Sequence, residues 1–267
     1  TFMGIAVKYL PRIPTYEKVF FRNSVSLMLS AFILFKEKES IKVEKANIPF
    51  VFGRSFFGFI GMVANFYALE NLTMAEANML NKLSPVFVTI CACIFLKERV
   101  DKKQVIGIIL MLLAVVFVIK PSFSPEVIPS LAGLFSAVLA GFSYTIIRYL
   151  NGKVKSEINV FYFSLLSVIC TFPLMMMNFV KPTLNEFLIL LGGIGISAAM
   201  GQFGLTYAYT FAPASEVSIY NYVIIITSML MDYVLFSTIP DLFSFIGGFM
   251  IMTTAIYLYI HNKKKDN

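Results

Sequence analysis

The chain alternates between long apolar runs and short polar connections, and this alternation predicts its membrane-spanning helices. Most runs are near the ~20 residues that a helix needs to cross ~30 Å of hydrocarbon, and a shorter run stands at the start. In order, the ten runs cover Thr1–Leu10, Tyr16–Phe35, Ile48–Leu69, Thr73–Val100, Gln104–Ile119, Leu131–Leu150, Ile158–Val180, Phe187–Tyr209, Glu216–Phe236 and Phe243–Ile260. We therefore expect an all-α membrane protein with ten transmembrane helices.

The fourth run carries a polar stripe inside an otherwise apolar segment. Asn78, Asn81, Lys82 and Pro85 are spaced i, i+3, i+4 and i+7, so a helix places them on one face. A charge at membrane depth costs roughly 2.5–3.5 kcal/mol on insertion scales. We therefore expect the stripe to face protein or a water-filled cavity.

The sequence pattern returns 140 positions later without a gap, which indicates an internal repeat. The aligned pairs include Glu76 and Glu216, Asn81 and Asn221, Lys82 and Tyr222, and Tyr67 and Tyr207. The repeats are residues 1–120 and 130–260, separated by a proline-rich connection and followed by a basic tail at 261–267. Since five helices per repeat is an odd number, the two repeats must insert with opposite orientation, as inverted repeats do.

The first run is only half a span. Its shifted counterpart begins near Leu131, which corresponds to a start about ten residues before Thr1. We therefore expect the first helix to be truncated at its N-terminus in this sequence.

Composition places the chain in the class of multi-pass membrane proteins. It is 58% hydrophobic and 14% charged, whereas soluble domains average about 45–50% apolar and about 25% charged. If the N-terminus is cytoplasmic, the connections on the cytoplasmic side contain 14 Lys and Arg residues and those on the outer side contain 5. This asymmetry predicts a cell membrane protein with both termini cytoplasmic, and it explains the net charge of +7 better than nucleic-acid binding does.

Catalytic patterns are not found in the sequence. The single histidine is His261 in the tail, and no Ser/His/Asp, Cys/His, HExxH or phosphate-loop pattern occurs. Cys91, Cys93 and Cys170 lie in apolar runs and are typical of small buried hydrophobic residues. We expect neither an enzyme nor a bound metal or cofactor; a channel or a signalling protein remains an alternative to a transporter.

The run Ala75–Ile119 resembles the EamA-type drug/metabolite transporter superfamily. In the family pattern, a helix with a proline ends in leucine–x–glutamate–arginine and is followed by an aliphatic helix with a glycine. Leu96, Glu98, Arg99 and Gly107 stand in those places, while the second repeat has Thr238 where glutamate is usual. The resemblance implies ten helices, a central cavity and alternating access without ATP.

The polar residues of the fourth and ninth runs are the candidate substrate site, because inverted-repeat transporters bind substrate where the repeats meet. We expect a small zwitterionic or anionic metabolite, amino acid-like or nucleoside-like, because Asn81 and Lys82 share the stripe. The sequence leaves open whether the solute is imported or exported, whether transport is coupled to protons, and whether the protein is a monomer or a homodimer. The candidate residues are Tyr67, Asn78, Asn81, Lys82, Tyr207, Ser218, Asn221 and Tyr222.

Two charged pairs are candidate gates. Glu76 and Glu216 begin repeat-related helices that run in opposite directions, so they should lie at opposite mouths of the cavity. Arg22 lies a few residues into a helix that enters from the outer side, so it would pair with Glu76 at the outer mouth. Arg54 lies equally far into a helix that enters from the inner side, so it would pair with Glu216 at the inner mouth. Thr73-x-x-Glu76 is also a capping-box pattern, which is the structural alternative for Glu76.

One further carboxylate lies close to the outer end of the ninth run. We expect Asp232 at the membrane interface.

Overall fold

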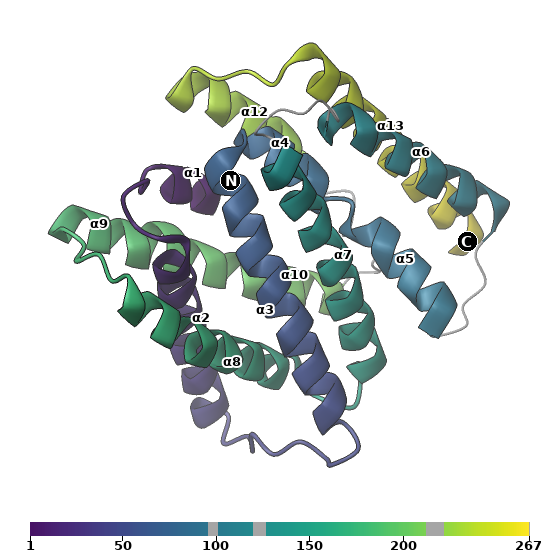
Figure 1. The fold of residues 1–267 in the computed structure, drawn as a ribbon. Helices are drawn as coiled ribbons and strands as arrows, with labels where there is room; N and C mark the ends of the chain where they lie inside the picture. The colour runs from purple at the N-terminus through teal and green to yellow at the C-terminus, as the bar shows by residue number, and fades with distance from the viewer. Residues whose placement is uncertain (96–100, 120–126, 212–221, 267) are drawn as a thin grey trace.

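A computed structural model describes the backbone of residues 1–95, 101–119, 127–211 and 222–266, and the side chains of 1–95, 101–119, 127–204 and 222–261. This part of the chain is helical and contains no strand. The helices are α1 (Phe2–Lys8), α2 (Thr15–Lys36), α3 (Ile48–Asn71), α4 (Met74–Asn81), α5 (Ser84–Phe95), α6 (Lys102–Ile119), α7 (Val127–Leu150), α8 (Ser156–Met177), α9 (Leu184–Leu188), the π-helix η1 (Ile189–Ile196), α10 (Ser197–Phe211), α12 (Val223–Phe236) and α13 (Leu242–Asp266) (Figure 1).

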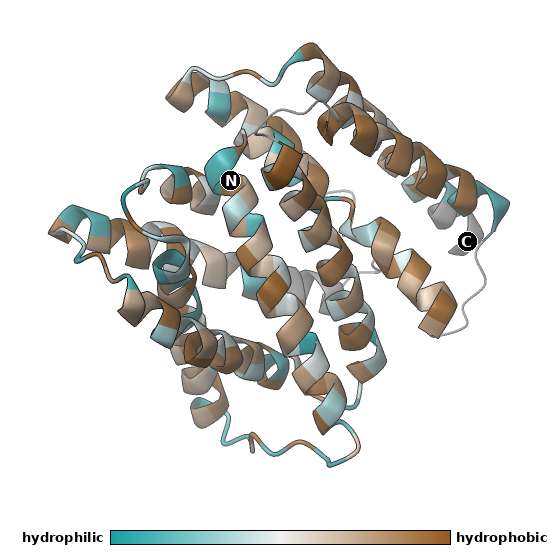
Figure 2. Cartoon of the chain, in the orientation of Figure 1, coloured by the Kyte–Doolittle hydropathy of each residue, from teal (hydrophilic) through white to brown (hydrophobic). Residues whose placement is uncertain are grey.

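The expected membrane spans are confirmed in order and in approximate length. Eight helices, counting Met74–Phe95 and Leu184–Gly204 as one each, are long and apolar enough to cross a bilayer, and Val223–Phe236 is a shorter apolar helix. Apolar residues cover the long helices, and polar residues gather at their ends and in the connections (Figure 2). On α6, Ile106, Ile109, Leu113 and Val116 form one half-exposed stripe suited to lipid contact.

The two repeats are visible in the helix boundaries. Adding the 140-residue shift carries α2 onto α8, α3 onto η1 with α10, α5 onto α12 and α6 onto α13. The packing partners follow the same relation (Figure 1). Helix α2 packs on α8 and α6 on α13, while α3 packs on α7 as η1 and α10 pack on α1. Helices of one repeat therefore pack mainly on helices of the other, as a two-fold arrangement of inverted repeats requires.

The fourth span is broken near its middle, between α4 and α5. Pro85 lacks an N–H, and its ring clashes with the carbonyl four residues earlier, that of Asn81. The chain passes Lys82 and Leu83 in a tight turn, in which the Leu83 N–H donates to the Leu80 carbonyl at 3.1 Å. The break therefore follows from the sequence and puts Lys82 at the end of α4.

The eighth span contains an eight-residue π-helical stretch, η1. Its glycines allow close packing: a Cβ on Gly195 would lie 2.5 Å from Val25 Cγ2 of α2, and one on Gly193 would lie 2.8 Å from Ala6 Cβ of α1. π-Helical turns are rare and are often found at functional sites.

Candidate functional site

The polar stripe of the fourth span faces protein. Asn78 Nδ2 donates to Ser228 Oγ of α12 at 2.8 Å and to the Met74 carbonyl at 2.8 Å. Asn81 Nδ2 donates to Ser136 Oγ of α7 at 3.3 Å. The stripe thus contacts two helices of the second repeat, and one hydrogen bond of the Asn78 amide holds α4 to α12 while the other stays within α4.

Lys82 differs from its stripe neighbours. It lies at the turn between α4 and α5, and its side chain is partly buried. Within the described ranges, no carboxylate lies within ion-pair distance of its ammonium group. Its ammonium group thus lies at a helix break inside an apolar span, where a charge is costly unless it has a partner or water.

Two tyrosines of the predicted site lie in different surroundings. Tyr222 is buried at the start of α12, at the position that the repeat relates to Lys82. Tyr67 is 40% exposed and lines a groove of about 420 Å³ between α2 and α3. The groove is also lined by Thr15, Tyr16, Ile60, Val63 and Ala64. Ser218, Asn221, Glu216 and the side chain of Tyr207 lie outside the described residues.

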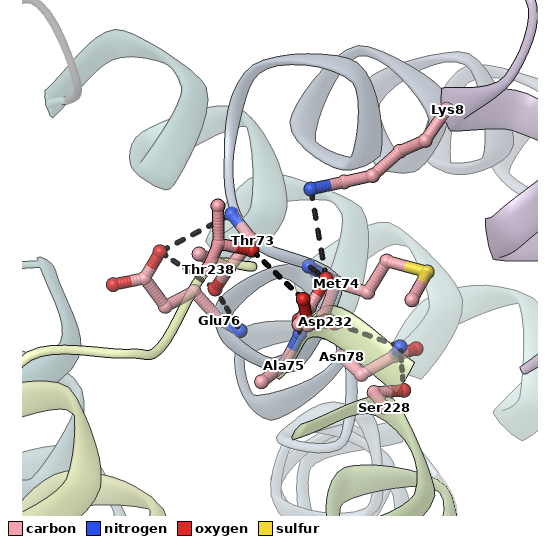
Figure 3. A network of polar contacts seen from close by, with 9 residues as sticks. All are labelled: Lys8, Thr73, Met74, Ala75, Glu76, Asn78, Ser228, Asp232 and Thr238. Carbon is pink, nitrogen blue, oxygen red and sulfur yellow. Dashed lines mark hydrogen bonds and ion pairs between the residues drawn. The ribbon is translucent and has the colours of Figure 1, made fainter. Parts of the chain in front are cut away.

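The N-terminus of α4 is held by a buried carboxylate from the other repeat (Figure 3). Asp232 of α12 accepts the Met74 N–H at 3.1 Å through Oδ1 and the Ala75 N–H at 2.8 Å through Oδ2. Lys8 Nζ of α1 lies 3.7 Å from Oδ1. We call Lys8, Asp232 and the two backbone N–H groups the Asp232 network. Asp232, expected at the membrane interface, is fully buried in the protein, where these donors compensate its charge.

The remaining free donors of this helix end are satisfied by the capping box. Glu76 N–H donates to Thr73 Oγ1 at 3.1 Å, and Thr73 N–H donates to Glu76 Oε2 at 3.3 Å. Ser244 Oγ of α13 donates to Glu76 Oε1 at 2.6 Å. The structural interpretation of Glu76 is therefore confirmed, and this helix end is tied to α1, α12 and α13 together.

The arginines are not placed as the gate hypothesis expected. Arg22 donates to Asn23 Oδ1 at 3.0 Å and to Met62 Sδ at 2.8 Å, and it forms no ion pair with Glu76 in this structure. The partner proposed for Arg54 lies outside the described residues. Arg22 and Arg54, predicted from different depths, reach one ring: their Cζ atoms lie 5.9 Å and 4.2 Å from the centroid of Phe163.

Several of these partners were missed from the sequence. Lys8 lies in the half-length first run, and Ser136, Ser228 and Phe163 are ordinary residues of apolar helices. A lone carboxylate in the ninth apolar run was the one available signal for the role of Asp232, because charges at membrane depth are costly unless paired.

Comparison with known proteins decides the family. The EamA-like transporter family matches residues 1–120 and 128–260, which is nearly the whole chain and one match for each repeat. The chain belongs to the EamA-like transporter family. The resemblance noted in the fourth and fifth runs is thereby confirmed, and the chain is a multi-pass membrane protein of a transporter family.

Similar proteins include transporters with different solutes. The pseudopaline exporter CntI of Pseudomonas aeruginosa is 30% identical, over 92% of this chain and 86% of that protein. The S-adenosylmethionine uptake transporter of Rickettsia conorii is 27% identical, over 97% of this chain and 88% of that protein. A crystal structure with 18% identity superposes with a TM-score of 0.62, covering 99% of this chain and 98% of the other, and supports the fold.

Proposed function

We propose that the chain is a secondary transporter that moves a small organic metabolite across the cell membrane by alternating access, without ATP. One observation carries the proposal: the fourth span is broken beside Lys82, where the first repeat meets the second. Broken helices at the interface of inverted repeats commonly form the substrate site of secondary transporters.

The substrate site in this proposal is built on the break. Lys82, Asn81 and Tyr222 contribute from the described part of the chain, with Tyr207, Ser218 and Asn221 as further candidates from the second repeat. Asn78 contributes by holding α4 against α12, and Tyr67 by lining the groove between α2 and α3. Lys82 favours a zwitterionic or anionic solute, because an uncompensated cation binds a negative group of the solute.

The Asp232 network closes one mouth of the pathway in this proposal. With both termini cytoplasmic, α4 starts and α12 ends on the outer side, so the closed mouth is the outer one. Opening it requires Asp232 to leave the Met74 and Ala75 N–H groups and Lys8. Protonation of that carboxylate would weaken all three contacts, which makes the proton the candidate coupling ion.

The relatives support a small-metabolite solute but differ in direction. One is named as an exporter and the other as an uptake transporter. Reconstitution must therefore measure both directions.

The test uses the full chain in proteoliposomes with radiolabelled S-adenosylmethionine, glutamate and uridine as probes. A transporter gives saturable uptake of at least one probe, and the same unlabelled solute inside the vesicles accelerates it. Lys82→Met keeps the bulk of the side chain and should lower the uptake rate at least tenfold, whereas Lys103→Met, at an exposed position of α6, should not. Failure of all three probes to saturate would contradict the proposal, and a non-saturating flux would indicate a channel.

A further inference from the structure

Two arginines and one aromatic ring form a second polar cluster inside the helix bundle. Arg22 comes from α2, Arg54 from α3 and Phe163 from α8. The two guanidinium carbons lie 5.9 Å and 4.2 Å from the ring centroid, so they are separated by no more than the sum of these distances. We call these three side chains the arginine cluster.

The positive charges of the arginine cluster lack a counter-charge within the described ranges. The polar partners of Arg22 are the Asn23 amide oxygen and the Met62 sulfur, both uncharged. Arg54 is only 4% exposed, and its Nε and Nη1 have no hydrogen-bond partner; the same is true of Arg22 Nε. Two like charges without an anion in a low-dielectric interior are costly, whereas a bound anion would compensate both.

The wall of the arginine cluster is bare backbone on one side. A Cβ on Gly58 of α3 would lie 3.1 Å from Phe163 Cε2 and 3.3 Å from Arg54 Nη1. One and two turns further along the same face of α3 lie Met62 and Asn65, and Asn65 Oδ1 also has no partner. Unpartnered polar atoms therefore occur twice on this face of α3, at Arg54 and at Asn65.

We propose that the arginine cluster binds a carboxylate group of the transported metabolite. The proposal rests on the transport function above and narrows its solute to organic anions and zwitterions that bear a carboxylate. A guanidinium offers its N–H groups in a planar fork that matches the two carboxylate oxygens. Stacking on Phe163 keeps the Arg54 fork in one orientation, and Nε and Nη1 of this fork are buried without a protein partner.

The binding test measures the melting temperature Tm of the purified chain in detergent at constant ionic strength. The probes are acetate, succinate and citrate, their neutral counterparts acetamide and succinamide, inorganic phosphate, and sodium chloride as reference. At least one carboxylate should raise the Tm saturably, by roughly 5–10 °C at 100 times its Kd, and the amides should not. A rise with phosphate alone, with chloride alone or with the amides would overturn the carboxylate assignment, as would no rise at all.

Variants separate a binding role from a structural one. Arg54→Gln and Arg22→Gln should abolish the carboxylate-induced rise while the ligand-free Tm stays equal or increases, because an uncompensated charge is removed. Arg54→Lys should weaken binding, since the charge stays and the fork is lost. Arg148→Gln, at an exposed position near the end of α7, is the matched control. A large drop in ligand-free Tm together with an unchanged carboxylate response would assign the arginines a structural role and overturn the proposal.

Transport assays distinguish this inference from the proposed function. If uptake is saturable and unchanged in both arginine variants, the proposed carboxylate site is wrong and the proposed transport function stands. If a carboxylate binds but shows no saturable flux into vesicles, the proposed carboxylate site stands and the proposed transport function is wrong.

Discussion

The two polar clusters within the membrane-spanning helices differ in how their charges are compensated. In the Asp232 network, one carboxylate meets two backbone N–H groups and an ammonium group. In the arginine cluster, two guanidinium groups meet a ring, a sulfur and an amide, and three of their nitrogens have no partner. A satisfied buried charge holds helices together, whereas an unsatisfied one is costly and is the basis of the proposed carboxylate site. The comparison separates a closed contact from a proposed binding site by the partners of each charge.

The largest expected effect comes from breaking the satisfied cluster. Asp232→Ala leaves the Met74 and Ala75 N–H groups and the Lys8 ammonium without their buried partner. Removing one member of a buried charged contact costs roughly 3–5 kcal/mol, so the free energy of unfolding should fall by about that much. Thermal unfolding in detergent measures the loss.

Asp101→Asn is the matched control for that variant, because its carboxylate lies in a connection, away from the buried end of α4. A loss from Asp232→Ala no larger than that from Asp101→Asn would show that the Asp232 network is not the stronger of the two carboxylate contacts. The contrast with the arginine cluster would then lose its basis.

A smaller effect is expected from filling the arginine cluster. Gly58→Ala introduces a methyl group 3.1 Å from Phe163 Cε2 and from Ser143 Oγ. The extra group should weaken carboxylate binding about tenfold, which corresponds to about 1.4 kcal/mol. Titration of the Tm with the carboxylate that stabilises the parent protein measures the change.

Gly201→Ala of α10 makes the same substitution where no atom lies within 4 Å of the added carbon. It should leave carboxylate binding unchanged. Equal affinities for the parent and for both glycine variants would mean that the carboxylate does not bind beside Gly58.

The smallest effect concerns a polar pair that water reaches. Asp101, in the connection before α6, faces His261 Nε2 of α13 at 2.7 Å. Two hydrogen bonds hold the pKa of Asp101 below its ordinary value: the larger effect comes from the Gln104 backbone N–H and the smaller one from His261. A lowered pKa means that the contact stabilises the folded protein above the ordinary pKa of an aspartate, about 4, and that this contribution is lost as the pH falls further.

The Tm should therefore fall when the pH is lowered below about 4, and it should fall less steeply in Asp101→Asn. Other carboxylates titrate in both proteins, so the difference between the two pH profiles reports Asp101 alone. Parallel pH profiles for the parent and the variant would exclude a contribution from this pair. Because both groups are in contact with water, the effect should stay well below that of Asp232→Ala.

The sequence by itself determined the spans, the repeat and the family. Hydropathy is a property of short windows, so the order and approximate limits of the spans could be predicted before any packing was known. The turn after α4 has an equally local cause, the ring and missing N–H of Pro85. The capping box at Thr73 and Glu76 also needs only four neighbouring residues.

The tertiary structure alone decided which charges are compensated. Asp232 lies 157 positions along the chain from Ala75, and Phe163 lies more than 100 positions from Arg54. Depth along a helix, which the topology predicts, does not fix the direction of a side chain, and long arginine side chains from different depths reached one ring. The contacts of a buried charge depend on three or four helices at once, and therefore no local pattern in the sequence could have predicted them.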